Sequence, residues 1–406
     1  MRLLIINQHA ANHGDEAAGK ALLRALDKEN EIKQVDILYN KMNMLDEEKL
    51  TLETALCITH HSAAILSLFD KAFIILSFLL PFWLIRILPK TPCLKPEFKL
   101  IGNADIVVSA PSGVNIGPYR DWWYLWRLYV ALKFHKPLGV YSISFGPIPK
   151  NRLFKSVSVY VLRKAKFISL RDKQSQAYAE EYNIEYVPSI DTAFLDNTFS
   201  KNLPTEITSM SDRGYVVMVP NELYSWHSYY RNINTESLDK IYLDIINLFT
   251  NKGLDIVLLP QRFGSKNDSK YFERLRQQIP NKENINITCD EYSSDIQQSI
   301  VNNAKFLVGA RYHSIVFAIR GEIPFVALSY EHKIQHMLSS LFLDKYAVDL
   351  KEVLEQESST QLIKKIEVCF DKREMIKQEL SLANKRANDI AKKTFLTFKS
   401  FLEGIA

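Results

Sequence analysis

The stretch of residues 305–333 limits the fold of this chain most, because it reads as a strand, a helix and a second strand. The apolar run at 306–308 has the length of a buried strand, and a second apolar run follows at 325–330. Between them, residues 315–319 fit a short buried helix. Strands joined through a helix pair in parallel, so this stretch predicts a doubly wound α/β sheet.

Two chemically active side chains directly follow the first of these strands. They are Arg311 and His313, and Ser314 can cap the next helix, which Gly321 can end. Open parallel sheets bind their ligands at the carboxyl ends of their strands. A guanidinium, an imidazole and the free N–H groups of a helix start all favour an anion at such a place. A surface arginine and a structural histidine beside a turn are the alternative interpretation.

The residues of this stretch also resemble a family signature. Residues 308–314 (Val-Gly-Ala-Arg-Tyr-His-Ser), 321–324, 327–331 and Lys333 are similar to the C-terminal signature of the polysaccharide pyruvyl transferases. A looser similarity extends from Asn12 to about Leu343. The resemblance implies transfer of a pyruvyl group from phosphoenolpyruvate to a sugar, on a two-lobed fold similar to that of GT-B glycosyltransferases.

The resemblance also implies how the donor is held. Phosphoenolpyruvate is expected between the lobes, bound by Arg171 from one side and by Arg311 and His313 from the other. His313 is the candidate catalytic acid, because histidine exchanges protons near neutral pH. In the competing interpretation His313 only binds phosphate, and Asp15 or another carboxylate moves the proton. Phosphoenolpyruvate acts as donor substrate, and neither a metal nor a further cofactor is expected.

Further candidate substrate ligands lie at predicted strand ends or within segments similar to the family. Arg262 follows the predicted strand at 255–259, and the turn containing Gly113 follows the strand at 104–109. Asn12 and Asp15 lie in a loop before a helix, where a capped helix start is the alternative interpretation. The full set of substrate-binding candidates is Arg171, Arg311, Tyr312, Arg262, Lys333, Asn12, Gly113 and Glu331.

Arg171 stands at the end of the predicted strand at 167–170. Asp172 can cap the helix that follows. Arg171 could pair with Asp172 or with another acid at the surface. The match to a family segment that contributes a phosphoenolpyruvate-binding arginine favours the functional interpretation. For Asp191 we expect a role in a turn.

The alternation of strands and helices predicts an α/β fold of two doubly wound (Rossmann-like) lobes facing a cleft. We expect an N-terminal lobe at 1–200 and a C-terminal lobe at 201–375, which carries Arg311 and His313. A C-terminal helix at 376–406 is expected to pack back on the N-terminal lobe.

An apolar helical segment at 63–88 interrupts the N-terminal lobe. Residues 72–85 carry no charge, but this run of 14 residues is shorter than the roughly 20 that a membrane span needs. Such a helix suits either burial in the core or contact with a membrane interface. The segment is flanked by basic residues that would suit anionic lipid, namely Lys71, Arg86, Lys90, Lys95 and Lys99.

Composition narrows the partners of the chain. A net charge of +5 with 24% charged residues is mild and gives no signature of nucleic-acid binding, but it suits an anionic substrate or membrane surface. The four cysteines are scattered, with neither zinc-site nor disulfide spacing. The apolar start at 1–7 is too short for a signal peptide and reads as a strand. A cytoplasmic protein is expected, with peripheral contact at the inner face of the cytoplasmic membrane left open.

Three function classes remain at this point. The first is a pyruvyl transferase that forms a ketal on a glycan, with a lipid-linked oligosaccharide as the expected acceptor. The second is a GT-B-like glycosyltransferase that uses a nucleotide sugar, for which Glu331 could bind a ribose. The third is a non-catalytic component of a glycan assembly complex. Direct binding of phosphoenolpyruvate, of a nucleotide or of neither separates them.

Overall fold

The computed structural model describes the chain as two compact units. The first unit comprises residues 1–10, 15–196 and 389–406, and the second comprises 11–14 and 197–388. The residues described are 1–29, 31–42, 49–63, 65–87, 91–210, 214–227, 230, 234–264, 267–280, 282–289, 292–330, 332–356 and 358–405.

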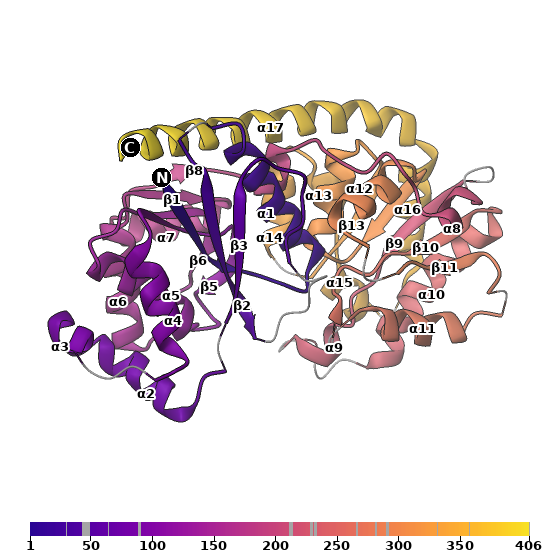
Figure 1. Ribbon diagram of the computed structural model, residues 1–406. Helices are drawn as coiled ribbons and strands as arrows, with labels where there is room; N and C mark the ends of the chain where they lie inside the picture. The colour runs from indigo at the N-terminus through magenta and orange to yellow at the C-terminus, as the bar shows by residue number, and fades with distance from the viewer. Residues whose placement is uncertain are drawn as a thin grey trace. The chain divides into compact units, whose positions relative to one another are not determined.

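The first unit is built on a parallel sheet with the order β3-β2-β1-β4-β6-β7-β8, and β5 pairs with β6 (Figure 1). Strand order reverses between β1 and β4, as in a doubly wound dinucleotide-binding fold. Its elements are β1 (Arg2–Gln8), α1 (His13–Leu26), β2 (Gln34–Met42), β3 (Cys57–Ala63), α2 (Leu68–Ser77), α3 (Phe82–Ile87), α4 (Leu94–Asn103), β4 (Ile106–Ser109), β5 (Ser112–Ile116), α5 (Trp122–Lys133), β6 (Leu138–Phe145), α6 (Arg152–Lys164), β7 (Phe167–Leu170), α7 (Lys173–Glu181) and β8 (Val187–Pro188), followed by a 3-10 helix at Thr192–Leu195.

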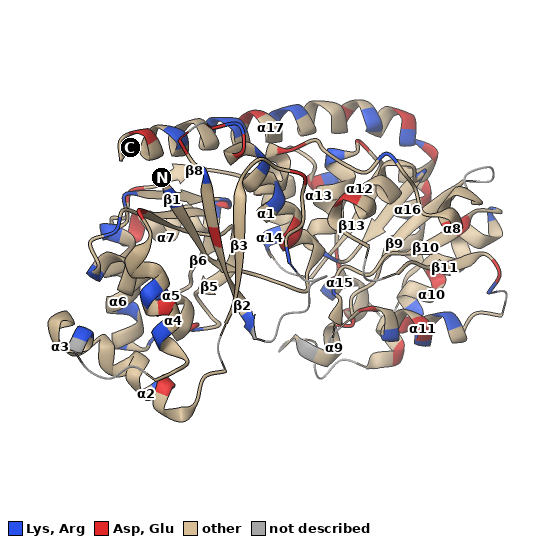
Figure 2. Ribbon diagram, viewed as in Figure 1, with Lys and Arg blue, Asp and Glu red and all other residues tan. Residues whose placement is uncertain are grey.

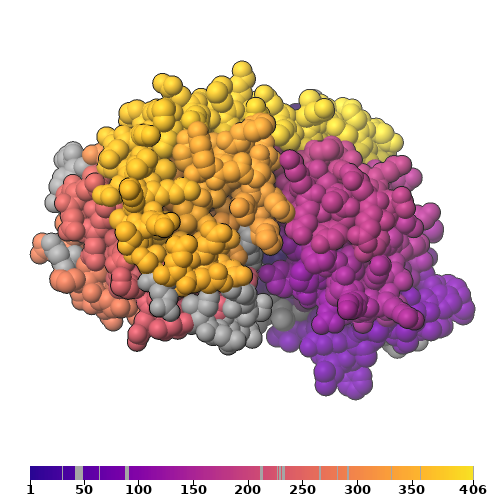
Figure 3. Space-filling view, turned by 180° about the vertical axis from the view of Figure 1, so that it is seen from behind, coloured from indigo at the N-terminus to yellow at the C-terminus, as the bar shows by residue number. Residues whose placement is uncertain are grey.

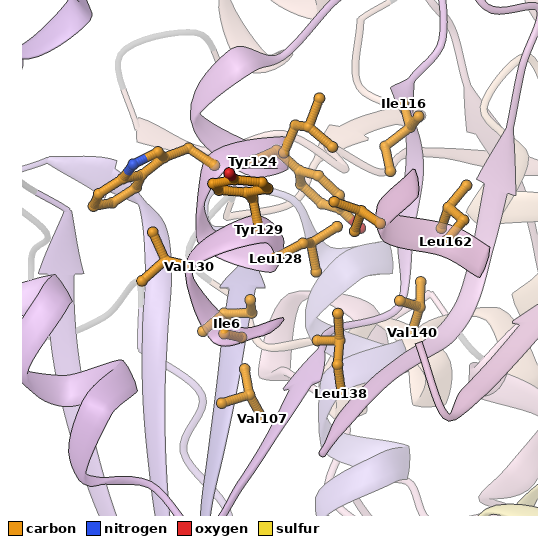
Figure 4. Packing of buried hydrophobic residues seen from close by; sticks show 14 of the residues in the cluster. Ile6, Val107, Ile116, Tyr124, Leu128, Tyr129, Val130, Leu138, Val140 and Leu162 are labelled. Atoms are coloured by element: carbon orange, nitrogen blue, oxygen red, sulfur yellow. The ribbon is translucent and has the colours of Figure 1, made fainter. Parts of the chain in front are cut away.

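Helices cover both faces of this sheet, so its strands β4, β6 and β7 are buried along their whole length, whereas the edge strand β3 is partly exposed. Side chains of a strand alternate between faces. Leu4 and Ile6 of β1 accordingly join one core cluster, whereas Leu3 and Ile5 join the other. Figure 4 shows the first cluster, in which residues of α5 such as Leu128 pack over β1, β4 and β6.

The aromatic helix α5 belongs to this core. Trp126 is fully buried and Tyr124 is almost so. These two aromatic side chains are therefore part of the core. The Tyr124 hydroxyl shares a hydrogen bond of 2.7 Å with Ser109 Oγ, which satisfies its polar group inside the core.

The second unit has a parallel sheet of six strands with the order β11-β10-β9-β12-β13-β14 (Figure 1). Its order also reverses once, between β9 and β12. Its elements are α8 (Thr205–Thr208), β9 (Tyr215–Val219), α9 (Leu223–Trp226), α10 (Thr235–Asn251), β10 (Asp255–Leu258), α11 (Ser269–Gln277), β11 (Ile285–Ile287), α12 (Ser294–Asn302), β12 (Phe306–Gly309), α13 (Tyr312–Arg320), β13 (Phe325–Ser329), α14 (His332–Ser340), a 3-10 helix at Asp344–Tyr346, β14 (Ala347–Asp349), α15 (Leu350–Glu355) and α16 (Thr360–Asp371).

These two sheets confirm the predicted fold class of doubly wound α/β units. The strands predicted at 306–308 and 325–330 are β12 and β13, which pair in parallel. The predicted cap at Ser314 is wrong, because α13 begins at Tyr312 with Arg311 as its N-cap residue. Ser314 lies inside the first turn, where its hydroxyl donates to the Arg311 carbonyl at 2.6 Å. Gly321 is the C-cap, as predicted.

The last helix, α17 (Arg373–Glu403), has 31 residues. Its residues up to Asn388 cluster with the second unit and those from Asp389 with the first. In the first unit, Phe398 meets the Tyr141 ring edge-on at 4.9 Å, and Phe395 and Leu402 join the same core cluster.

Within the described part of the chain, no helix is both long enough and apolar enough to cross a membrane.

Candidate functional site

The candidate site of the second unit lies at the carboxyl edge of its sheet. Strands β9 and β12 are neighbours where strand order reverses, which is the position at which doubly wound sheets bind ligands. Asn221 follows β9 there, and its side-chain amide donates to the Ala310 carbonyl at 3.2 Å. The chain after β12 is thereby fixed just before Arg311.

Tyr242 fixes the backbone of Asn221 after β9. Its hydroxyl accepts from the Asn221 N–H at 3.1 Å and donates to the Asn221 carbonyl at 3.2 Å. Burial raises the pKa of Tyr242, while the hydrogen bond from Asn221 and the positive charge of Arg311 oppose that rise. The Arg311 guanidinium therefore acts on the same buried polar cluster.

Arg311 forms an ion pair with Asp268, and both side chains are nearly buried, at 13% and 8% exposure. The second carboxylate oxygen of Asp268 accepts from the backbone N–H groups of Gln261 and Arg262, at 3.1 and 3.0 Å. One carboxylate thus fixes the turn after β10 and orients the guanidinium. Asp268 was not predicted from the sequence, where it is only an acidic residue in the polar turn before α11.

The guanidinium retains capacity for a further acceptor. Arg311 pairs with Asp268 through one terminal nitrogen, whereas its buried Nε has no hydrogen-bond partner among the residues described. Arg311 also immediately precedes the first N–H groups of α13, which carry partial positive charge. This arrangement can bind a carboxylate or a phosphate through paired N–H donors.

A short N-terminal segment, residues 11–14, is part of this unit and packs on the turn after β10. Asn12 forms an antiparallel β-bridge with Arg262, and the His13 N–H donates to the Gln261 carbonyl at 3.0 Å. The His13 ring stacks on Phe263 with centroids 4.4 Å apart. Sequence reasoning did not identify these contacts of His13 and Phe263, which join residues about 250 positions apart.

Gly14 lies directly against the imidazole of His313. A Cβ atom added to Gly14 would stand 1.9 Å from both Cγ and Nδ1 of that ring, far inside van der Waals contact. The Asn12 side chain accepts from the Gly14 N–H at 2.9 Å and so fixes this close approach. The structure therefore brings together Asn12, Arg262, Arg311 and His313 within the second unit.

The aromatic residue between Arg311 and His313 completes the cluster. Tyr312 and His313 are buried, with 7% and 9% exposure, and their rings meet edge-on at 5.1 Å. A buried imidazole packed between a tyrosine ring and a glycine has a fixed orientation. Such a group suits directed proton transfer or a directed hydrogen bond to a ligand.

The remaining predicted residues of the signature are placed as follows. Lys333 lies half-buried in the first turn of α14. Glu331, the candidate ribose ligand, falls outside the described residues. Asp15 is half-buried in the first turn of α1 and belongs to the first unit, and its carbonyl accepts from Gln8 Nε2 at 3.2 Å.

Arg171 belongs to the first unit and is deeply buried. It forms an ion pair with Asp191 at 2.8 Å, with exposures of 7% and 0%, and donates from Nε to Ser144 Oγ at 3.1 Å. The structure therefore pairs Arg171 with the buried Asp191 rather than with Asp172 or an acid at the surface. Asp172 caps α7, as predicted. Asp191 also accepts from the Ala193 N–H at 3.0 Å, which gives it the expected turn role.

Gly113 lies in β5, just beyond the carboxyl end of β4, where the strand order of the first sheet reverses. A side chain added there would meet nothing within 4 Å, so open space borders its backbone. Behind this edge, Arg127 is buried in an ion pair with Glu97 at 2.8 Å and donates to Asn7 and Asn40 at 3.1 and 2.9 Å.

Among the described residues, no group of histidine, cysteine, aspartate and glutamate side chains could hold a metal ion.

Comparison with known proteins adds family and fold. A family model described as polysaccharide pyruvyl transferase matches residues 12–332. The chain is 22% identical over 265 residues to the amylovoran biosynthesis protein AmsJ of Erwinia amylovora, a match that covers 62% of this chain and 62% of that protein.

Solved structures of the same fold include sugar-nucleotide enzymes. A putative UDP-N-acetylglucosamine 2-epimerase from Listeria monocytogenes aligns with a TM-score of 0.63 at 13% identity, covering 98% of this chain and 94% of that one. MnaA from S. aureus, in a co-structure with UDP, aligns with a TM-score of 0.61 at 12% identity, covering 99% and 97%. At these identities the likeness concerns the fold, which is of the GT-B type.

Proposed function

Because the chain belongs to the polysaccharide pyruvyl transferase family, we propose that it transfers a pyruvyl group from phosphoenolpyruvate to a sugar, forming a ketal and releasing phosphate. The proposed acceptor is a lipid-linked oligosaccharide in the biosynthesis of a surface polysaccharide. AmsJ, a relative that serves amylovoran biosynthesis, supports the polysaccharide context.

One observation carries the proposal: the Arg311 guanidinium stands at the strand-order reversal of the second sheet, before a helix start and beside the buried His313. Phosphoenolpyruvate has a carboxylate and a phosphate, and a planar guanidinium matches both groups through two parallel hydrogen bonds. Asp268 holds the guanidinium in place, so little ordering is left for the moment of binding.

The chemistry requires a proton donor close to the anion site. Protonation of the methylene carbon of phosphoenolpyruvate leaves an oxocarbenium-like centre at C2. A first sugar hydroxyl adds to C2 and loses its proton. A second hydroxyl of the sugar then displaces phosphate at C2 and loses its own proton, which closes the ketal ring. Phosphate leaves with the electrons of the C2–O bond, and no oxidant or metal enters this balance.

In this scheme His313 gives the proton to the methylene carbon. Its ring is held by Gly14 and Tyr312, which leaves little freedom for reorientation. The competing role is electrostatic: His313 binds phosphate, and a carboxylate such as Asp15 moves the proton. Participation of Arg171, Arg262, Lys333 and Gly113 in binding substrate stays a prediction.

A second candidate function is supported by the fold. Enzymes that align with this chain act on UDP-sugars or bind UDP by their descriptions, so a nucleotide-sugar glycosyltransferase is the alternative. The third class, a non-catalytic component of a glycan assembly complex, predicts binding of neither donor. Fold alone does not decide among these classes.

The decisive experiment incubates the protein with phosphoenolpyruvate and lipid-linked oligosaccharides of the producing cell, then looks for a pyruvyl ketal by mass spectrometry and for released phosphate. The expected result is one pyruvyl group gained per phosphate released, with loss of both in Arg311→Lys. Arg276→Lys is the matched control, since Arg276 lies partly exposed on α11 of the same unit. Sugar transfer from UDP-sugars without a pyruvyl product would overturn the proposal.

A further inference from the structure

The outer face of residues 65–86 in the first unit carries an unusual set of exposed apolar side chains. Large apolar side chains usually lie in the core. Six here are instead at least 43% exposed, and they are Ile65 (62%), Leu68 (82%), Phe69 (81%), Leu76 (43%), Leu79 (62%) and Trp83 (64%). Leu68, Phe69 and Leu76 share one face of α2 by their helical spacing, Trp83 lies on α3, and Ile65 and Leu79 lie just outside α2. We call these six residues the apolar ridge.

The opposite face of the same segment is anchored in the core. Ile74 and Ile85 are almost fully buried, and Phe78 packs against Trp122 and Tyr129 at 5.7 and 5.1 Å. Burial is therefore confirmed for one face of this stretch, whereas the other face is exposed and its contact with a membrane interface stays a prediction. Because the inner face is fixed, the apolar ridge is presented on a folded support rather than on a loose helix.

The exposed charges described on this segment are of one sign. Between residues 65 and 100 the sequence has only two acidic residues, Asp70 and Glu97, and both are buried. Ser67 is the N-cap of α2 and Asp70 completes its capping box, while Glu97 pairs with Arg127. Among the residues of this range that the structure describes, the exposed charged side chains are all basic, and they are Lys71, Arg86, Lys95 and Lys99.

Figures 2 and 3 show where this segment lies. In Figure 2 the ribbon of α2 and α3 is mostly tan, with few charged positions. In Figure 3 the purple atoms of this part of the chain project from the remainder of the first unit. Exposed apolar side chains flanked by the basic Lys71, Arg86, Lys95 and Lys99 suit an anionic lipid interface, because apolar groups enter the acyl boundary while lysine and arginine stay at the headgroups.

We propose that the apolar ridge is a membrane-interface anchor. It inserts Leu68, Phe69 and Trp83 into the headgroup and acyl boundary of an anionic bilayer, while the neighbouring basic side chains bind the headgroups. The occupant is a lipid surface rather than a second protein, because every exposed charged side chain that the structure describes between residues 65 and 100 is basic. The helices are too short to span a bilayer, so they lie along its surface. This inference does not depend on pyruvyl transfer.

The test is co-sedimentation of the full chain with vesicles of phosphatidylcholine and phosphatidylglycerol in equal parts. Wild type is expected to bind, and binding is expected to fall by about tenfold or more in the double variant Phe69→Glu/Trp83→Glu, because two large apolar groups are lost from the interface. The matched control is Leu396→Glu, an exposed leucine on α17 in the same unit with 62% exposure, which should bind like wild type.

A second variant separates the electrostatic contribution. Lys71→Glu/Arg86→Glu should weaken binding to the mixed vesicles and lose the response to salt, since the attraction to phosphatidylglycerol is screened. All four substituted positions are exposed, so folding is expected to survive and is checked by circular dichroism. Absence of binding by wild type, or equal binding by Phe69→Glu/Trp83→Glu, would overturn the proposal. So would a wild-type dimer in light scattering that the same double variant dissociates, because a second copy would then cover the ridge.

Discussion

Replacing Gly14 by alanine tests the placement of residues 11–14 beside His313. The new Cβ would stand 1.9 Å from two ring atoms, whereas ordinary contact begins at 3.4 Å, so the ring or the backbone must move by about 1.5 Å. The neighbours leave little room for that shift, because Asn12 binds the Gly14 N–H and Tyr312 packs against the ring. Overpacking of this kind destabilises proteins by about 1–3 kcal/mol.

The measurement is the free energy of unfolding of Gly14→Ala from urea titration. The matched control is Gly404→Ala, because a Cβ there has its nearest contact at 3.4 Å, within the ordinary range. We expect the control to lie within about 0.5 kcal/mol of wild type.

A double-mutant cycle assigns the cause. In a His313→Ala background the imidazole is gone, so Gly14→Ala should lose most of its destabilising effect and the two substitutions should be coupled by about 1 kcal/mol or more. If Gly14→Ala costs the same free energy with and without the imidazole, residues 11–14 do not lie where the structure places them. A stability of Gly14→Ala equal to that of wild type would refute the steric argument itself.

Three further predictions follow from the same contacts. His313→Gln should lower the maximal rate by roughly 10²–10⁴-fold if His313 is the acid, and steady-state kinetics that instead show a near-normal rate with weaker donor binding would make His313 a phosphate ligand. Asp268→Ala should destabilise the second unit by about 3–5 kcal/mol in urea, since it leaves Arg311 buried without its partner, and a loss no larger than that of the exposed Glu273→Ala would contradict this. Burial raises the pKa of Asp36, but hydrogen bonds from Arg2 and His61 lower it more, so its pKa lies below the ordinary 3.8. The stability that Asp36 contributes is therefore present above pH 3.8 and is lost as the pH falls through the lower pKa of the folded state. In Asp36→Asn the free energy of unfolding, measured by urea titration, should fall less steeply with pH at the acid end. An unchanged pH dependence at the acid end would count against the pairing of Asp36 with Arg2 and His61.

Local sequence patterns were sufficient to predict the strands β12 and β13 and the sheet edge at which Arg311 lies. The apolar runs at 306–308 and 325–330 sit between turn residues, and parallel pairing then places Arg311 at a carboxyl strand end. The cap at Ser314 was misassigned because a hydroxyl near a helix start can bond backwards as well as forwards. The helix instead begins immediately after Arg311.

Contacts between distant segments could not be predicted. Asp268 reaches Arg311 across 43 positions, and Gly14 meets His313 across most of the chain. The partner of Arg171 is likewise 20 positions away, in Asp191, and not the neighbouring Asp172. Such pairings depend on which strands lie side by side, and a single sequence carries no local signal for that order. The sequence also could not show which face of residues 65–86 is buried, because both faces are apolar and only tertiary packing covers one of them.

The central claim is that Arg311 binds the donor, and the most direct measurement is calorimetric titration of phosphoenolpyruvate into wild type and Arg311→Lys. We expect saturable binding by wild type and a free energy of phosphoenolpyruvate binding that is weaker by about 2–5 kcal/mol in Arg311→Lys, because lysine keeps the charge but not the paired donors. Arg276→Lys should titrate like wild type, and UDP should bind far more weakly than phosphoenolpyruvate. Equal affinity of Arg311→Lys and wild type for phosphoenolpyruvate, or tight binding of UDP without any binding of phosphoenolpyruvate, would contradict it.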